Sequence, residues 1–186
     1  MENTIMENTG ERFIPSASGP YEIRVNVERY LLALPHCKDK NVLELGCGCG
    51  LGTYMYSLVA KSLVAVDYSE EGLAYANSYP WDPAKVRLER MDLTVDVPKE
   101  RFDVVVATEF LEHIDDPATL LAKLNTERII FSFPFDSLQM SDWHRYPIRS
   151  GESGLKDIAD LMQKSYIIEE MKVQDKKWVF GIAKKK

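Results

Sequence analysis

Several features that would assign a sequence to a particular class of protein are missing from these 186 residues. No apolar run approaches the length that spans a bilayer, and the first residues form no apolar segment typical of a signal peptide or a membrane anchor. There are only three cysteines, and an odd number without a secretion signal argues for reduced thiols. We therefore expect a cytoplasmic protein that is not associated with a membrane.

Clustered positive charge is also scarce. Lysine and arginine total 23 against 29 aspartates and glutamates, the formal net charge is -6, and the only basic run is Lys184 to Lys186. A large nonspecific nucleic-acid surface needs clustered positive charge, so a nucleic-acid partner is not expected. Nothing in the composition indicates an oligomeric state.

The length and the hydrophobic content of 45% predict one domain with a sizeable core. Residues 1–20 are polar and rich in glycine, serine and proline. This composition predicts a flexible N-terminal arm ahead of a single domain over residues 21–186.

The chain is organised around residues 41–53, NVLELGCGCGLGT. Its apolar beginning predicts a buried strand, the glycines Gly46, Gly48 and Gly50 follow at alternate positions, and a helix is expected directly after them. Glycine permits positive φ and lets the backbone approach a ligand closely. A strand, a glycine loop and a helix N-terminus together hold nucleoside-bearing cofactors at the carboxyl end of parallel sheets.

The spacing of the glycines decides between cofactors. The dinucleotide fingerprint G-x-G-x-x-G fails in both registers, because its last glycine falls on Leu51 or on Thr53. Glu44 lies two residues before Gly46, where a carboxylate would be a poor neighbour for a pyrophosphate but would suit a cationic ligand.

Cys47 and Cys49 form a C-x-C pair inside the same loop. Structural zinc sites usually have four ligands at other spacings, and the sequence has no second cysteine cluster. We therefore interpret both cysteines as small loop residues and expect no metal site.

The segment ELGCGCG resembles the E/D-x-G-x-G-x-G motif of the class I S-adenosylmethionine-dependent methyltransferases. The resemblance extends from about Tyr21 to the C-terminus and implies an α/β fold: a three-layer, Rossmann-like sandwich with a seven-stranded, mostly parallel sheet whose last strand is antiparallel. It implies S-adenosyl-L-methionine as the cofactor and S-adenosyl-L-homocysteine as the product. The alternative is a glycine-rich turn without a ligand.

The segment TGERFIP, Thr9 to Pro15, resembles a short motif that precedes the first helix in some small methyltransferases. The arm is therefore either a surface segment or a lid that closes over the cofactor.

The hydrophobic pattern predicts alternating strands and helices. Strands are expected at 41–45, 62–66, 86–93, 102–108, 128–133, 166–173 and 178–183, the last two joined as a hairpin. Helices are expected at 21–34, 52–60, 70–79, 118–124 and 154–164. Pro35 is expected to end the first helix. The apolar face of that helix is predicted to consist of Ile23, Val27, Tyr30, Leu31 and Leu34.

Two acidic residues at strand ends extend the candidate cofactor site. Asp67 lies at a strand end 17 residues after Gly50, where an acid can accept hydrogen bonds from both ribose hydroxyls. The same segment is also a good helix start with Ser69 as its cap, and both roles can hold. The resemblance assigns the adenine amino group to Asp92, for which an ordinary turn residue is the alternative.

The stretch FDVVVATEFLEHIDDP resembles the fourth motif of the small-molecule methyltransferases, which borders the methyl-transfer site. His113 is the first candidate for a base or an orienting group, because a helical turn would place it on one face with Glu109 and a free histidine titrates near neutral pH. The alternative is a histidine that caps a short helix. His144 is the second candidate, with a surface loop histidine as its alternative.

With the resemblance, the predicted cofactor-binding residues are Glu44, Gly46, Cys47, Gly48, Gly50, Asp67, Tyr68, Met91, Asp92, Leu93, Thr108, Glu109 and Phe110.

The acceptor is expected to be a small molecule that is methylated by in-line displacement. Nucleic-acid amino-methyltransferases carry N/D-P-P-Y/F after the fourth strand, whereas residues 107–110 read ATEF here. The alternatives are a cofactor-binding module of the same fold without catalysis, a methyltransferase with a protein or RNA acceptor, and a nicotinamide-dependent oxidoreductase.

Overall fold

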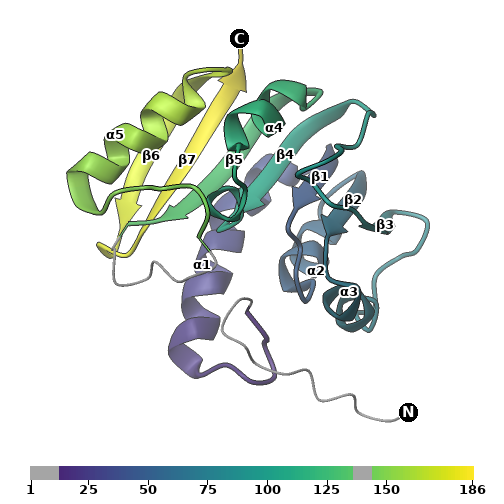
Figure 1. The fold of residues 1–186 in the computed structure, drawn as a ribbon. Helices are drawn as coiled ribbons and strands as arrows, with labels where there is room; N and C mark the ends of the chain where they lie inside the picture. The colour runs from purple at the N-terminus through teal and green to yellow at the C-terminus, as the bar shows by residue number, and fades with distance from the viewer. Residues whose placement is uncertain (1–12, 136–143) are drawn as a thin grey trace.

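The computed structural model describes residues 13–135 and 144–186, in which seven strands form one sheet (Figure 1). The strands are β1 (Asn41–Leu45), β2 (Ser62–Asp67), β3 (Val86–Arg90), β4 (Phe102–Thr108), β5 (Thr126–Pro134), β6 (Tyr166–Gln174) and β7 (Trp178–Lys185). They are arranged in the order β3-β2-β1-β4-β5-β7-β6. The first five strands pair in parallel, and β7 pairs antiparallel with both β5 and β6. The predicted α/β class and the antiparallel last strand are confirmed.

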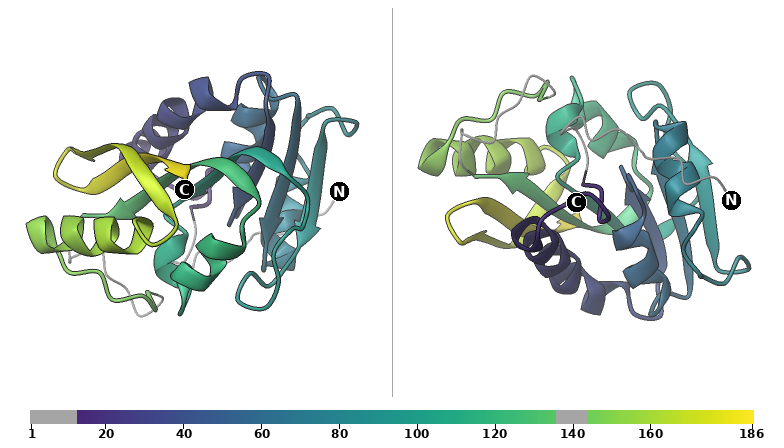
Figure 2. Two further views of the ribbon diagram at one scale, coloured as in Figure 1. Left: turned by 90° about the horizontal axis from the view of Figure 1, so that it is seen from above. Right: turned by 90° about the horizontal axis from the view of Figure 1, so that it is seen from below.

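Helices cover both faces of the sheet, which gives the three layers seen in Figure 2. They are α1 (Pro20–Cys37), α2 (Leu51–Ser57), α3 (Glu70–Ala76), α4 (Pro117–Lys123) and α5 (Gly151–Met162), with a single 3-10 turn, η1 (Leu111–His113). On one face, α1 and α2 pack in a core that includes Val42 and Tyr56. On the other face, α4 and α5 pack in a core that includes Leu43 and Ile158.

The middle of strand β4, residues 104–107, is apolar because both of its faces are covered. Val104 and Val106 enter the core beneath α1 and α2, while Val105 and Ala107 enter the core beneath α4 and α5. Successive side chains of a strand point to opposite faces, so a strand covered on both sides has no polar face.

The first helix differs from its prediction in its end and in its buried face. It continues through Pro35 to Cys37, because the hydrogen bond lost at the proline is offset by the complete burial of Ala33 and Cys37 in the last turns. The predicted apolar face is wrong at Ile23 and Leu31, which are 36% and 50% exposed, whereas Tyr30 and Leu34 are partly buried against the core. The buried residues are Val25, Arg29, Ala33 and Cys37. The small side chains at 33 and 37 let the helix lie close to the sheet.

The other elements differ from prediction mainly at their ends. Helices α2 and α3 each end three residues early, at Ser57 and Ala76, and β3 ends at Arg90. Strand β5 is longer at both ends, and α5 spans 151–162 rather than 154–164. The predicted hairpin is confirmed: its two turn residues, Asp175 and Lys176, have φ of 52° and 58°, which matches the twist of the flanking strands.

The centre of the sheet is where the order of the strands reverses. Strand β1 lies between β2 and β4, and the helices that follow β1 and β4 lie on opposite faces. In open α/β sheets, the crevice at the carboxyl ends of such strands is where ligands bind. Within the described part of the chain, no helix has the length and apolar character needed to cross a membrane.

Gly181 in β7 pairs with Phe131 in β5 and tests the packing of the antiparallel half. A Cβ at position 181 would lie 2.1 Å from Cζ of the fully buried Phe131. We expect Gly181→Ala to lower the free energy of unfolding by about 1–3 kcal/mol, measured by urea denaturation, because the core has no space for the methyl group. Ile167→Thr, at a side chain 57% exposed on β6, is the control and should change it by less than about 0.5 kcal/mol. Equal stability of Gly181→Ala and wild type would contradict this account of the packing.

Candidate functional site

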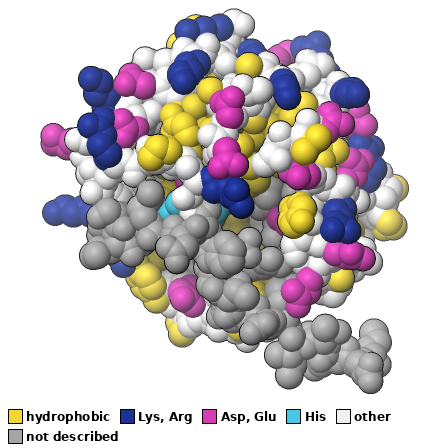
Figure 3. All heavy atoms as spheres, in the orientation of Figure 1, with side chains coloured by type: hydrophobic (Ala, Val, Ile, Leu, Met, Phe, Trp, Pro, Cys, Tyr) yellow, Lys and Arg dark blue, Asp and Glu magenta, His cyan; other side chains and the backbone are white. Residues whose placement is uncertain are grey.

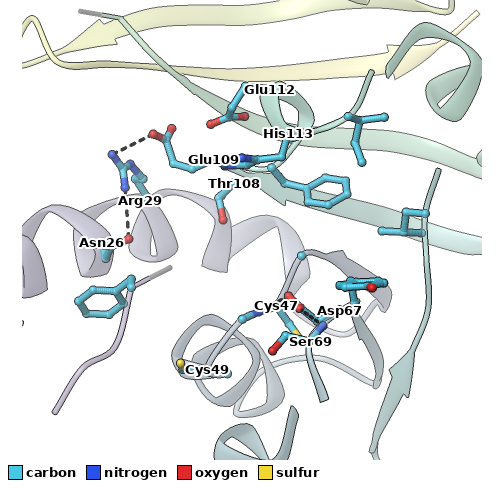
Figure 4. A pocket seen from close by; sticks show the side chains of 18 of the residues that line it. Asn26, Arg29, Cys47, Cys49, Asp67, Ser69, Thr108, Glu109, Glu112 and His113 are labelled. Carbon is cyan, nitrogen blue, oxygen red and sulfur yellow. Dashed lines mark hydrogen bonds and ion pairs between the residues drawn. The ribbon is translucent and has the colours of Figure 1, made fainter. Parts of the chain in front are cut away.

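A cavity of about 990 Å³ lies at the carboxyl ends of β1, β2 and β4 (Figure 4). In the view of Figure 3, which has the orientation of Figure 1, histidine atoms reach the surface close to a Lys or Arg side chain. The cavity brings together most of the predicted site residues. It is lined by Gly46, Cys47, Gly48, Gly50, Asp67, Tyr68, Met91, Asp92, Leu93, Thr108, Glu109, Phe110, His113 and His144. Glu44 is the predicted residue that does not line it.

The loop after β1 needs glycine for two reasons. Gly46, Gly48 and Gly50 have φ of 68°, 53° and 81°, a region that other residues rarely adopt. A Cβ at Gly46 would also lie 2.3 Å from the ring of Phe110, whereas a Cβ at Gly48 would meet no atom of the described chain within 4 Å. The backbone at Gly48 is therefore open to a ligand.

Asp67 joins this loop to the end of β2. One carboxylate oxygen accepts a hydrogen bond from the Gly48 N–H (2.7 Å) and the other accepts one from the Ser69 N–H (2.8 Å). The Ser69 hydroxyl in turn accepts from the Gly72 N–H (3.0 Å) and caps α3, as predicted. The Asp67 carboxylate thus holds two loops in place at the floor of the cavity.

Asp92 lies after β3 at the rim of the cavity. Its Oδ1 accepts hydrogen bonds from the backbone N–H and the hydroxyl of Thr94, and these bonds lower the pKa of the exposed carboxyl. Asp92 therefore forms a turn, as one prediction had it, and its neighbours Met91 and Leu93 line the cavity beside it.

Glu44 lies beneath the glycine loop. It is 3% exposed and accepts a hydrogen bond from the Thr53 hydroxyl (2.6 Å). Burial raises the pKa of its carboxyl to about 8, so the group keeps its proton at neutral pH. The prediction that Glu44 would be a charged partner for a cationic ligand therefore does not fit this position. Glu44 instead supports the glycine loop through its hydrogen bond with Thr53 at the start of α2.

The two loop cysteines are buried as well. Burial, with Glu44 as the next cause, raises the pKa of Cys47 well above its usual range.

The sequence analysis missed Arg29 of α1, which lines the cavity opposite the glycine loop. Its side chain is 8% exposed, its Nη2 lies 3.3 Å from Oε2 of Glu109, and its guanidinium stacks 5.1 Å from the ring centre of Trp178. Glu109 is held in turn by the Ser132 hydroxyl, which donates to its Oε1 (2.8 Å). The sequence does indicate the burial of Arg29 by its spacing, because Arg29 lies four residues from both Val25 and Ala33, which are buried on the same face of α1.

The segment after β4 is not the α-helix that the sequence analysis assumed. Glu109 has a positive φ of 48°, and only Leu111–His113 forms a single 3-10 turn. The predicted helical spacing of Glu109 and His113 is therefore wrong, although both line the cavity.

Glu112 and His113 lie close to Glu109 in the wall of the cavity (Figure 4), and His144 lines the same cavity. Glu112 was also missed; it is 1% exposed, and burial together with Glu109 raises its carboxyl pKa well above the usual range. The rings of His113 and His144 lie 5.0 Å apart. Burial, and next the proximity of His113, lowers the pKa of His144 from its ordinary value.

Comparisons with known proteins agree with this geometry. The family model described as a methyltransferase domain matches residues 43–126. A probable S-adenosylmethionine-dependent methyltransferase of Mycobacterium tuberculosis is 35% identical over 117 residues, which cover 61% of this chain and 41% of that protein. A ubiquinone biosynthesis O-methyltransferase of Bradyrhizobium diazoefficiens is 32% identical over 98 residues, covering 52% and 38%. The chain spans about two fifths of the length of these relatives.

Solved structures show the same fold. The N-methyltransferase NodS of Bradyrhizobium japonicum in complex with S-adenosyl-L-homocysteine superposes with a TM-score of 0.70 at 18% identity, over 91% of this chain and 89% of that one. The DhpI complex with the same product gives a TM-score of 0.71 at 19% identity, over 91% and 88%. The chain therefore has the fold of these methyltransferases, and its residues 43–126, which include the glycine loop, are similar to a methyltransferase domain.

The buried Glu44 predicts a specific dependence of stability on pH. Its pKa is about 8 in the folded chain against an ordinary value of 4.5, so between these values the unfolded chain releases a proton that the folded chain retains. The free energy of unfolding therefore falls as pH rises through this window, by at most about 1.4 kcal/mol per pH unit from this group. Glu44→Gln can keep the bond to Thr53 but does not titrate. Urea denaturation from pH 5 to 9 should show the wild type losing stability relative to Glu44→Gln; parallel profiles would contradict the assignment.

Proposed function

We propose that this chain transfers the methyl group of S-adenosylmethionine to a small-molecule acceptor by in-line displacement. The observation that carries the proposal is a single cavity with two chemically different ends. The glycine loop and Asp67 form one end, and Arg29, Glu112 and the two histidines form the other. Its volume of about 990 Å³ lies at the upper end of the range for small-molecule sites, which suits a cofactor together with a small acceptor.

At the cofactor end, Asp67 accepts hydrogen bonds from the ribose hydroxyls. Each of its oxygens already accepts one backbone hydrogen bond, and an ionised carboxylate has about four acceptor positions, so room remains for both hydroxyls. Asp92 accepts from the adenine amino group, with Met91 and Leu93 beside the ring. The open backbone at Gly48 lies against the methionine part of the cofactor.

The segment that leads into α1 covers this end of the cavity. Phe13 and Ser18 line the cavity, and Ile14 is 2% exposed in a small cluster with Cys49 and Tyr75. These contacts favour the lid over the plain surface arm for residues 13–20, ahead of the domain over residues 21–186. Residues 1–12 of the expected arm, and with them most of the motif at Thr9 to Pro15, lie outside the described residues.

At the acceptor end, the protein positions a nucleophile in line with the methyl–sulfur bond. The sulfonium supplies the reactive carbon and the positive charge, and orientation of this kind is worth up to about 7–11 kcal/mol. His113 and His144 line this end of the cavity and orient the acceptor.

The size and charge of the site support a small acceptor. The net charge of -6 disfavours a nucleic acid, and the polar end of the cavity is walled by the largely buried Arg29 and Glu112. Similar proteins include O- and N-methyltransferases, by their names. The odd number of cysteines, all of them buried, supports a reducing compartment, which we propose is the cytoplasm.

The cofactor assignment is tested by Asp67→Asn. Hydrogen bonds to a charged group contribute about 1.5–3 kcal/mol, so this change should weaken the binding of S-adenosylhomocysteine about 10- to 150-fold in titration calorimetry. Asp96→Asn removes the same charge at an exposed residue outside the cavity, and its affinity should match the wild type. Unchanged affinity in a folded Asp67→Asn protein would show that the ribose lies elsewhere.

The activity itself is tested with methyl-labelled S-adenosylmethionine. We expect label to move to a member of a panel of phenols, amines and carboxylic acids, with S-adenosylhomocysteine released in equal amount. Parallel incubations contain protein extract and RNA. Label in either of these alone would replace the small-molecule acceptor with a macromolecular one, and absence of transfer in a protein that binds the cofactor would indicate a binding module without catalysis.

A further inference from the structure

Glu112, His113 and His144 bring three potential metal ligands to one place. One carboxylate oxygen and one nitrogen from each histidine all lie within 4.8 Å of one another. Two of the three residues are adjacent in η1, and the third comes from the loop before α5, more than thirty residues further along the chain. A cluster assembled from two segments gives no ligand spacing in the sequence, and the expectation of no metal site rested on the cysteines alone.

The cluster is held together by the backbone. The Glu112 carbonyl oxygen accepts hydrogen bonds from the N–H groups of Arg145 (2.8 Å) and Tyr146 (3.0 Å), the two residues that follow His144. These bonds fix the loop against η1 and leave the rings of His113 and His144 5.0 Å apart. The arrangement therefore does not depend on a chance approach of long surface side chains.

The carboxylate of Glu112 supplies an independent sign of a missing ligand. It is 1% exposed, yet its Oε2 has no hydrogen-bond partner among residues 13–135 and 144–186. A buried polar group without a partner is costly, and such groups in native proteins commonly mark a functional site or a bound ion. The nearby Arg29 does not fill this role, since its charge is paired with Glu109 at 3.3 Å.

We propose that Glu112, His113 and His144 bind a divalent transition-metal ion, with zinc the best match, at the acceptor end of the cavity. Two imidazole nitrogens and one carboxylate oxygen are a common set of protein ligands for catalytic zinc, and three protein ligands leave a position open. Tetrahedral ligation at about 2.0–2.2 Å needs donor atoms about 3.3 Å apart, so the present cluster contracts slightly around the ion.

The open position faces the cavity and takes an oxygen atom of the acceptor, a step that rests on the proposed function. A hydroxyl bound there gives up its proton to water more readily. Its oxygen then forms the bond to the methyl carbon, and the carbon–sulfur bond breaks with its electron pair left on sulfur as a neutral thioether. The oxidation state of the ion does not change. The acceptor of this site is therefore a compound that is methylated at oxygen.

The test is a titration of the full chain with Co²⁺ alone, followed by displacement with Zn²⁺ in calorimetry. We expect one ion per chain and visible absorption bands typical of nitrogen and oxygen ligands. Loss of residues that merely support a metal ligand weakens affinity about 10- to 100-fold, so Glu112→Gln, His113→Ala and His144→Ala should each weaken it by at least about 100-fold. His36→Ala removes the one histidine that does not line the cavity and should bind like the wild type.

Two results would overturn the proposal. One is an intense near-ultraviolet band from a cobalt–thiolate bond, which would place the ion on the cysteines; the other is equal affinity in Glu112→Gln and wild type. Binding of S-adenosylhomocysteine is measured in the same samples, both to confirm that each variant is folded and to separate the two claims. A chain that binds this product but no metal refutes the metal site alone, whereas a chain that binds metal but not the product refutes the proposed function.

Discussion

The Asp67 carboxylate is the interaction on which the site depends. It accepts a hydrogen bond from the loop after β1 at Gly48 and another from the loop after β2 at Ser69. These loops follow neighbouring parallel strands, so a single side chain fixes their separation. Because hydrogen bonds to a charged acceptor are stronger than those to a neutral one, the floor of the cavity is held in shape before any ligand arrives. A preorganised site loses less conformational entropy on binding.

The glycine loop is also held by the segment that follows β4. The ring of Phe110 occupies the space that a side chain at Gly46 would need. Beneath the loop, the buried Glu44 carboxyl accepts from Thr53 at the start of α2 and keeps its proton. The loop is thus held by three side chains: Glu44 from β1, Asp67 from the end of β2 and Phe110 from the segment after β4. The unusual backbone angles at Gly46, Gly48 and Gly50 follow from these constraints.

The residues proposed for the cofactor end could be predicted to meet in one cavity because they lie in short runs at the ends of consecutive strands, at 46–50, 67–68 and 91–93. Those of the acceptor end could not. Arg29 comes from a helix whose buried face was misjudged, because the face is defined by the small Ala33 and Cys37 rather than by large apolar side chains. Glu112 was quoted within the motif after β4 but was given no role of its own. Glu44 was expected to contact the ligand, because its strand pattern gives no sign that α2 covers it.

The two ends of the cavity also rest on different halves of the sheet. The cofactor end depends on β1, β2 and β3, whereas Arg29 stacks on Trp178 of β7 and pairs with Glu109, which Ser132 of β5 holds in place. Changes in the antiparallel half can therefore alter the acceptor end while Asp67 and the glycine loop stay in position. The fold as a whole tolerates wide sequence change, since NodS has it at only 18% identity. Under the proposed function, we therefore expect acceptor specificity to depend on the β5–β7 half of the sheet rather than on the glycine loop.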